Sequence, residues 1–234
     1  MDINFNTLNL ELGPEHECSY LPGFVAQERA CRVQGLDAGL YRKLMDHGWR
    51  RSGDILYKPF CPACNRCRPL RIPVGEFRPN RSQRRVLERN SDLHVELRKP
   101  YATESKFLLF RRYQVIRHGG AMCDTWGDYT RFLYTSPLKT VELETWLGER
   151  YLGSAILDAD AGSLSAVYNY YEPEMPERSL GVYAILKSIE LARERGDSYY
   201  YMGYVVEGCA QMEYKRVYKP YEVLGEEGEW ERSK

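Results

Sequence analysis

The chain has 234 residues and carries 33 Lys/Arg against 33 Asp/Glu, so its formal net charge at neutral pH is zero. This length allows one large or two small domains with a real core, and no apolar run approaches the ~20 residues that a membrane helix needs. The N-terminus, Met1-Asp2-Ile3-Asn4, lacks the basic start and apolar stretch of a secretory signal peptide. We therefore expect a cytoplasmic protein that has no membrane partner.

The residues before Pro100 form short elements separated by turn formers. Gly48 closes a helical pattern, and two short strand-like runs flank a loop that contains three cysteines. The predicted elements are a helix over 41–48, strands over 55–58 and 70–74, a helix over 82–90 and a strand over 93–98. We expect residues 1–99 to form a small N-terminal domain that is basic and contains cysteines.

After Pro100 the elements are longer and more regular. The predicted elements are helices over 103–118 and 128–135, strands over 140–147, 151–158 and 163–171, a helix over 180–195, and strands over 198–206 and 221–224. Two helices, a strand meander, a helix and a strand are typical of an α+β domain with a mostly antiparallel sheet. This is also the order of acetyltransferase-like (GNAT-type) folds, so we expect residues 100–234 to form such a domain.

The signature for coenzyme A is incomplete. Acetyltransferase-type folds hold a pyrophosphate on a glycine-rich turn at a helix start, where free N–H groups face the phosphate. The candidate turn here runs from Arg178 through Gly181 to Tyr183. Because a tyrosine stands at the last position, its bulk would obstruct close approach to the backbone. We expect the fold without coenzyme A.

The zero net charge conceals an asymmetry along the chain. Residues 42–99 carry 15 Lys/Arg and 6 Asp/Glu, a local charge of +9, whereas the flanking regions are acidic. Arg81, Arg85 and Arg89 recur at helical spacing on one face. A located basic face indicates an anionic partner such as a nucleic acid. The alternative is that these charges pair with the acidic regions inside the protein.

Nine short motifs occur in order between about Cys18 and Leu224. They are Gly48-Trp49-Arg50-Arg51-Ser52-Gly53, Tyr57-Lys58-Pro59, Phe77-Arg78-Pro79, Ser82-Gln83-Arg84-Arg85, Ser165-Ala166-Val167-Tyr168, Tyr171-Glu172-Pro173, Ser179-Leu180-Gly181-Val182-Tyr183-Ala184, Met202-Gly203-Tyr204 and Met212-Glu213-Tyr214-Lys215. Together they resemble the aminoacyl-tRNA–protein transferases, a family of eukaryotic arginyltransferases and shorter bacterial aspartate/glutamate leucyltransferases. The short length and the spacing of Cys61, Cys64 and Cys67 are similar to the bacterial leucyl branch.

The resemblance implies transfer of leucine from leucyl-tRNA to the α-amine of proteins that begin with Asp or Glu, a step of N-end rule degradation. The donor ester is already activated, so the transfer itself requires no cofactor. The enzyme must position two substrates, assist loss of the amine proton and stabilise an oxyanion. The predicted catalytic residues are Tyr168, Tyr204, Tyr214 and Lys215. For the tyrosines, the alternative is a half-buried structural role.

The resemblance also implies two kinds of substrate contact. Arg178 is predicted to pair with the acidic side chain of the acceptor, because a planar guanidinium suits a carboxylate. The predicted tRNA phosphate contacts are Arg78, Arg81, Arg84, Arg85 and Arg89. A solvated loop charge and a solvated helix face are the respective alternatives.

Cys61, Cys64 and Cys67 lie at i, i+3 and i+6, a spacing at which thiols can turn toward one point and hold a metal. With Cys18 they total four thiols, enough for zinc or an iron–sulfur cluster. The Cys-Gly-Tyr-Cys start of the eukaryotic relatives is replaced by Cys18-Ser19-Tyr20-Leu21, which lacks the second thiol. Unliganded or redox-labile thiols are the alternative, and Cys123 is expected to be a lone thiol.

Two other functions remain open from the residues alone. One is transfer of arginine in place of leucine, since no residue that selects the amino acid is identifiable. The other is a metal-dependent tRNA- or RNA-binding regulator that has no transferase activity.

Overall fold

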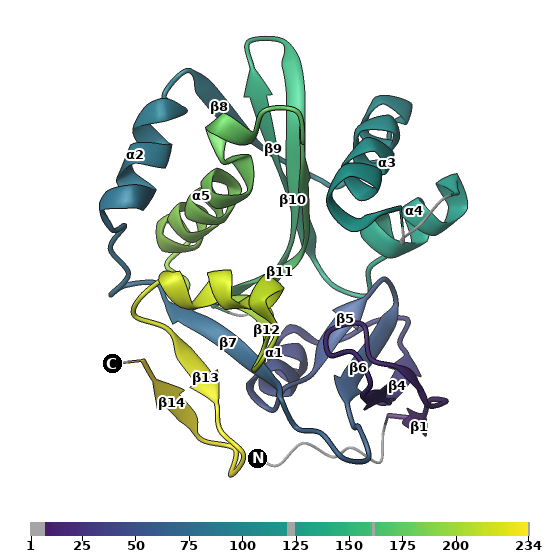
Figure 1. The fold of residues 1–234 in the computed structure, drawn as a ribbon. Helices are drawn as coiled ribbons and strands as arrows, with labels where there is room; N and C mark the ends of the chain where they lie inside the picture. The colour runs from purple at the N-terminus through teal and green to yellow at the C-terminus, as the bar shows by residue number, and fades with distance from the viewer. Residues whose placement is uncertain (1–7, 121–124, 161, 234) are drawn as a thin grey trace.

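The structure is a computed structural model that describes residues 8–120, 125–160 and 162–233. Met1-Asp2-Ile3-Asn4 and Cys123 lie outside the described residues. An eight-stranded sheet in the order β14-β13-β7-β12-β11-β10-β9-β8 forms the centre (Figure 1). Its strands are β7 (Cys67–Pro73), β8 (Leu93–Arg98), β9 (Thr140–Leu147), β10 (Arg150–Asp160), β11 (Ser163–Tyr171), β12 (Tyr199–Val206), β13 (Glu222–Leu224) and β14 (Trp230–Arg232).

Neighbouring strands of this sheet are antiparallel except for β11 and β12, which are parallel. The α+β class with a mostly antiparallel sheet is therefore confirmed. The tight turns of the meander use glycine: Gly148 lies between β9 and β10 with φ of +56°, in the left-handed region that favours glycine.

A smaller sheet, in the order β1-β4-β6-β5, lies at the lower right of Figure 1. Its strands are β1 (Glu11–Leu12), β4 (Glu28–Arg32), β5 (Arg50–Ser52) and β6 (Ile55–Pro59); β2 (His16–Glu17) and β3 (Val25–Ala26) form a separate pair. Helix α1 (Ala38–Asp46) completes this unit. Tyr41, Leu44, Trp49 and Leu56 bury their side chains against Tyr201 of β12. The two sheets therefore share a hydrophobic contact.

The large sheet also recruits strands from the first hundred residues. β7 lies between β12 and β13, and β8 forms the far edge beside β9. The expected N-terminal segment 1–99 thus supplies two strands to the sheet of the segment 100–234. The division at residue 99 stays a prediction.

Helices cover both faces of the large sheet (Figure 1). Helices α2 (Arg81–Arg89) and α5 (Leu180–Glu194) lie together on one face, and α3 (Glu104–His118) and α4 (Trp126–Tyr134) lie on the other. In β10, Ala155 and Leu157 pack with α5, whereas Ile156 packs with α3 and α4, because successive side chains of a strand point to opposite faces. No helix among the described residues is long and apolar enough to cross a bilayer.

The parallel pair separates part of the way along its length. β11 and β12 pair over three positions only, the last being Ser165 with Tyr201, yet β11 continues to Tyr171 and β12 to Val206. A bulge in the pairing of β12 with β7 falls at the same point, between Tyr201 and Tyr204. We call the space between residues 166–171 and 202–206 the wedge. Open edges of this kind leave backbone groups available to side chains or ligands.

Candidate active site

Two buried cations enter the wedge, where strand pairing has ended. Arg50, on β5, donates from Nη2 to the carbonyl oxygen of Ala166 on β11, at 2.8 Å. Lys215, on the 3₁₀ helix η3 (Ala210–Val217), donates from Nζ to the carbonyl oxygen of Tyr204 on β12. Only 6% of Arg50 and 7% of Lys215 is exposed. Side-chain donors thus replace the hydrogen bonds that the diverging strands do not form.

Arg50 and Lys215 both approach the backbone at Gly203. Its φ of +78° belongs to the left-handed region. A Cβ atom placed on it would lie 3.8 Å from Nζ of Lys215 and 3.9 Å from Nη2 of Arg50. Both cationic groups therefore lie within 4 Å of the point where a Cβ atom would stand. The left-handed φ accounts for glycine in the Met202-Gly203-Tyr204 motif.

The electrostatics of Lys215 are unusual. Burial, followed by the charge of Arg50, lowers the pKa of its amine from 10.5 to about 7. The thiols of Cys209 and Cys67 act in the opposite direction. Lysine titration near neutral pH, in a place where the backbone is open, is a feature of functional sites.

Arg51, next to Arg50, has a different environment. Its Nε donates to Oδ2 of Asp158 at 2.7 Å, and neither side chain of this ion pair is exposed. Thr140 and Tyr41 donate further hydrogen bonds to the same carboxylate. The pair fastens β5 to β10, and thereby holds Arg50 at the wedge.

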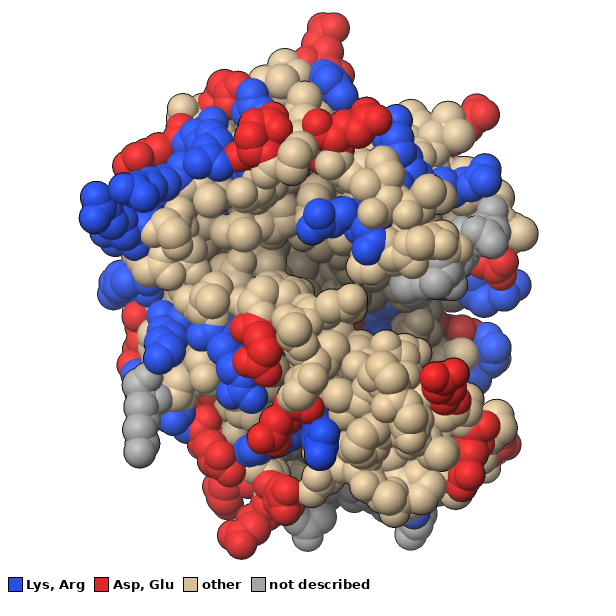
Figure 2. Space-filling view, viewed as in Figure 1, with Lys and Arg blue, Asp and Glu red and all other residues tan. Residues whose placement is uncertain are grey.

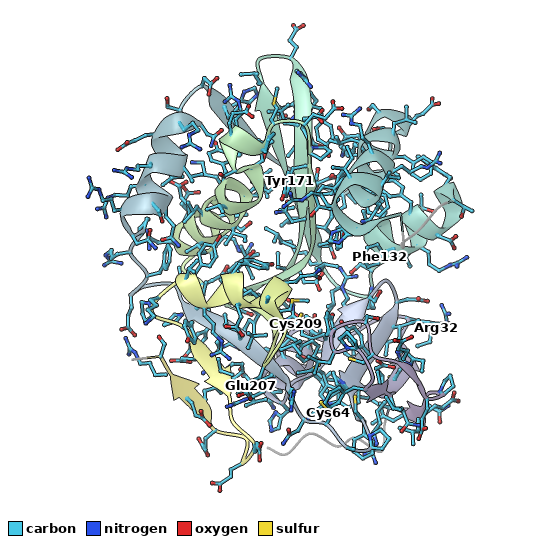
Figure 3. All side chains as sticks on the ribbon, in the orientation of Figure 1. Arg32, Cys64, Phe132, Tyr171, Glu207 and Cys209 are labelled. Carbon is cyan, nitrogen blue, oxygen red and sulfur yellow. The ribbon has the colours of Figure 1, made fainter. Side chains whose placement is uncertain are left out.

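The first turn of α5 is covered by an aromatic ring. A Cβ atom on Gly181 would lie 2.8 Å from Cε1 of Tyr171, so this ring rests directly on the turn (Figure 3). Tyr183, in contrast, is 2% exposed and packs into the core against Leu152 and Leu180. The expectation that Tyr183 obstructs this turn is wrong, because its position on the helix points it inward. Tyr171 does so instead, and the absence of coenzyme A stays a prediction.

The four predicted catalytic residues do not form one cluster. Tyr168 accepts a hydrogen bond from Gln114 at 2.5 Å and packs against Phe110 on the side of α3 and α4. The hydroxyl of Tyr204 donates to the carbonyl oxygen of Gly48 at 2.6 Å. Tyr214, on η3, is 48% exposed, with its ring centre 5.9 Å from Nζ of Lys215. Lys215 is the predicted residue whose functional group reaches the wedge, and the roles of the tyrosines stay predictions.

A hollow opens over β11 at the centre of one face, between α5 and α3 and with η3 at its lower edge (Figure 2). Lys and Arg side chains lie along its rim. Two residues of this region were not predicted from the sequence as site residues. They are Arg50 of β5, which donates to Ala166 of β11, and Tyr171 at the end of β11. Both stand in motifs that the sequence analysis had quoted, and that was the signal that could have found them.

The predicted tRNA contacts lie on or near α2. Arg81, Arg84 and Arg85 are exposed, and Arg/Lys side chains gather over this helix in Figure 2. Arg84 also donates to the carbonyl oxygen of Pro79, and Arg89 to that of Glu177. Asn80 caps the start of the helix: its side chain accepts from the backbone N–H of Gln83, and the side chain of Gln83 accepts from the N–H of Asn80.

Two further predicted contacts are already engaged within the protein. Arg178 forms two hydrogen bonds with the carboxylate of Asp92, at 2.8 and 2.9 Å. Arg78 donates to the carbonyl oxygens of Gly75 and Phe77. Substrate binding by either side chain stays a prediction.

The cysteines pack in an apolar cluster. Cys18, Cys64 and Cys67 contact Leu21, Val206 and Cys209, and Cys61 faces Cys64 in a single β-bridge. Burial, followed by the neighbouring thiols, raises the pKa of Cys67 to about 12, whereas metal ligation requires the thiolate. In the described ranges, no three Cys, His, Asp or Glu side chains are grouped so that they could hold a metal ion. The predicted zinc or iron–sulfur site is therefore not supported, and we assign no step to it.

The fold is of the acetyltransferase-like (GNAT) type that the order of elements predicted. Among solved structures, the crystal structure of FemX shows this fold, with a TM-score of 0.52 at 10% identity over 90% of this chain and 85% of FemX. Residues 16–85 and 105–225 match the N and C termini of the family described as arginine-tRNA-protein transferase.

Curated relatives support the same assignment. This chain is similar to the aspartate/glutamate leucyltransferases of Hahella chejuensis (39% identity; 94% of this chain and 96% of the relative) and Shewanella oneidensis (35%; 100% and 99%). That of Pseudomonas fluorescens is 41% identical, over 89% of this chain and 90% of the relative. The chain belongs to the arginine-tRNA-protein transferase family, and the resemblance noted in its motifs is confirmed.

Proposed function

We propose that this protein transfers leucine from leucyl-tRNA to the α-amine of proteins that begin with Asp or Glu, and that the wedge is the place of transfer. The assignment to an aminoacyltransferase rests on full-length relatives named aspartate/glutamate leucyltransferase. The observation that carries the location is the buried pair of Arg50 and Lys215 where β11 and β12 separate. Cytoplasmic location and a place in N-end rule degradation belong to the same proposal.

The reaction places few chemical demands on the protein. The amine nitrogen attacks the carbonyl carbon of the leucyl ester, a C–N bond forms, and the C–O bond to the ribose breaks. The amine loses a proton, and the ribose oxygen gains one. Negative charge is present on the tetrahedral intermediate and on the acidic acceptor, and fixed cations in a water-poor place stabilise it strongly. Lys215 and Arg50 are the cations that meet this requirement.

A transfer assay tests donor and acceptor together. Labelled leucyl- and arginyl-tRNA are each incubated with peptides that begin with Asp, Glu, Arg or Ala. Leucine is expected on the Asp and Glu peptides and absent from the other two. Arginine in place of leucine would assign the chain to the arginyl class, and tRNA binding without any transfer would favour the regulator.

For tRNA binding, we propose that the exposed arginines of α2 contact phosphates. The double change Arg81→Glu with Arg85→Glu is expected to weaken tRNA binding and to flatten its dependence on salt, because each lost phosphate contact lowers the slope of log K against log salt by about 1. Fluorescence titrations at several salt concentrations measure both quantities. Arg131→Glu, exposed on α4, is the control. An unchanged slope in the double variant would place the tRNA elsewhere.

A further inference from the structure

We propose that Arg50 and Lys215 together form the site that binds the side-chain carboxylate of the acceptor's first residue, and so select Asp and Glu. This deepens the proposed function and rests on it for the identity of the acceptor.

The first argument is a comparison of buried cations. Five Lys or Arg residues are buried in the described part of the chain. Arg51 pairs with Asp158, Arg71 with Asp46 and Glu222, and Lys106 with Glu142 and Glu144. Arg50 and Lys215 form no ion pair among the described residues. A buried charge without a counter-charge is strongly unfavourable, so two adjacent ones indicate a site whose anion arrives with the substrate.

The second argument is the capacity for hydrogen bonds. Arg50 uses Nη2 for Ala166, while its Nη1 has a contact of 3.9 Å with the sulfur of Met45. Lys215 can donate three hydrogen bonds and donates one to Tyr204. Both groups lie within 4 Å of the point where a Cβ atom on Gly203 would stand. A planar guanidinium beside an ammonium matches the two oxygens of a carboxylate.

The third argument separates a carboxylate from a transient oxyanion. An oxyanion exists only during the reaction, and dipoles or a single cation suffice for it. Two cationic side chains in one buried place are better matched by an anion that is present throughout binding. The same pair rejects Asn and Gln, because a neutral amide would leave both cations buried without a counter-charge.

Binding of short peptides to the full-length protein, without tRNA, tests this by calorimetry. A peptide beginning with Asp is expected to bind about 100-fold or more tightly than its Asn counterpart. In Arg50→Met and in Lys215→Met this ratio is expected to fall below about 10-fold. Lys187→Met, on α5 and paired with Glu190, is the control and keeps the ratio of the wild type. A retained ratio in both wedge variants would overturn the proposal.

Proton uptake on peptide binding distinguishes direct contact between Lys215 and the carboxylate from a purely structural role of Lys215. The charged and titratable groups around Lys215 are Arg50, Cys67 and Cys209, and the ring of Tyr214 is centred 5.9 Å from its Nζ. A carboxylate bound there raises the pKa of Lys215 from about 7, so peptide binding at pH 7.5 takes up protons. The binding enthalpy of the Asp peptide is then expected to vary with the ionisation enthalpy of the buffer in the wild type, and not in Lys215→Met. Uptake that persists in Lys215→Met would contradict the proposal.

Two further measurements apply if a variant does not fold or if peptide binding is too weak to measure. If a methionine variant unfolds, Arg50→Lys and Lys215→Arg, which retain the charge, are expected to keep most of the Asp preference. If peptide binding alone is too weak, the ratio of kcat/KM for Asp and Asn peptides replaces it. Asp-selective binding without leucine transfer would reject the proposed function and keep this inference. Leucine transfer with unchanged selectivity in the variants would do the reverse.

Discussion

Replacing Lys215 with methionine is expected to lower kcat/KM for leucine transfer to an Asp-starting peptide by about 10²–10³-fold, because a buried cation that meets substrate charge is lost. Methionine has a similar length and no charge, so the core around Tyr204 and Cys209 stays filled. Steady-state assays with leucyl-tRNA in excess measure the effect, and circular dichroism checks the fold. A loss of less than about 5-fold, with tRNA binding intact, would remove Lys215 from the site.

The pH dependence of this effect follows from the pKa of Lys215. The charged form is present below about pH 7 and is lost as the pH rises above it. Lys215→Arg keeps its charge at these pH values. The ratio of kcat/KM for Lys215→Arg over the wild type is therefore expected to increase between pH 6.5 and 8.5. A flat ratio would show that the charge on Lys215 does not matter for transfer.

The same shift predicts a change in stability. Because folding lowers the pKa of Lys215 from 10.5 to about 7, the unfolded chain binds more protons between these values. The cost of burying the charge is fully present below about pH 7 and is relieved as the pH rises toward 10.5. The melting temperature of the wild type, relative to Lys215→Met, should therefore rise from pH 6.5 to 9.

Removing Arg51 is expected to have the largest effect on stability. Arg51→Met leaves Asp158 fully buried without its cation, which costs about 3–5 kcal/mol of unfolding free energy. Urea unfolding followed by circular dichroism measures this. Arg32→Met is the matched control, since Arg32 pairs with Asp54 while 63% of its side chain is exposed, and exposed pairs contribute about 0–1 kcal/mol.

A double variant tests whether the loss of stability in Arg51→Met comes from the unpaired buried charge or from altered packing. Arg51→Met with Asp158→Leu replaces both charges with apolar groups, and is expected to recover part of the loss. Equal losses for Arg51→Met and Arg32→Met would show that the buried pair does not hold the two sheets together. Because Arg51 fixes β5, its loss should also reduce transfer through displacement of Arg50.

Local patterns predicted the regular elements of the second half well. The strands expected over 93–98, 140–147 and 163–171 agree with β8, β9 and β11. Their alternating or apolar runs and flanking glycines are properties of a few consecutive residues. The strands of two residues, β1 to β3, were not predicted, since so short a segment has no period to detect.

Local sequence patterns did not predict the position of each strand within the sheets. A strand was expected over 70–74, in the N-terminal domain, but β7 lies in the middle of the large sheet. Pairing between β7 and β12 joins residues far apart in the chain, and no local preference encodes that choice. Likewise, the i, i+3, i+6 spacing of the cysteines does not report where the thiols point once the loop packs on Val206.

Motifs in the sequence were sufficient to select the family and to single out Lys215 as a candidate, and local patterns predicted the acetyltransferase-type order of elements. They could not show that Arg50, from the small sheet, reaches the same point, or that Arg178 is already paired with Asp92. Whether a cation is neutralised depends on what surrounds it, and burial together with distant acidic groups arises only when the chain folds. The tertiary structure therefore decided which charges remain available to a substrate.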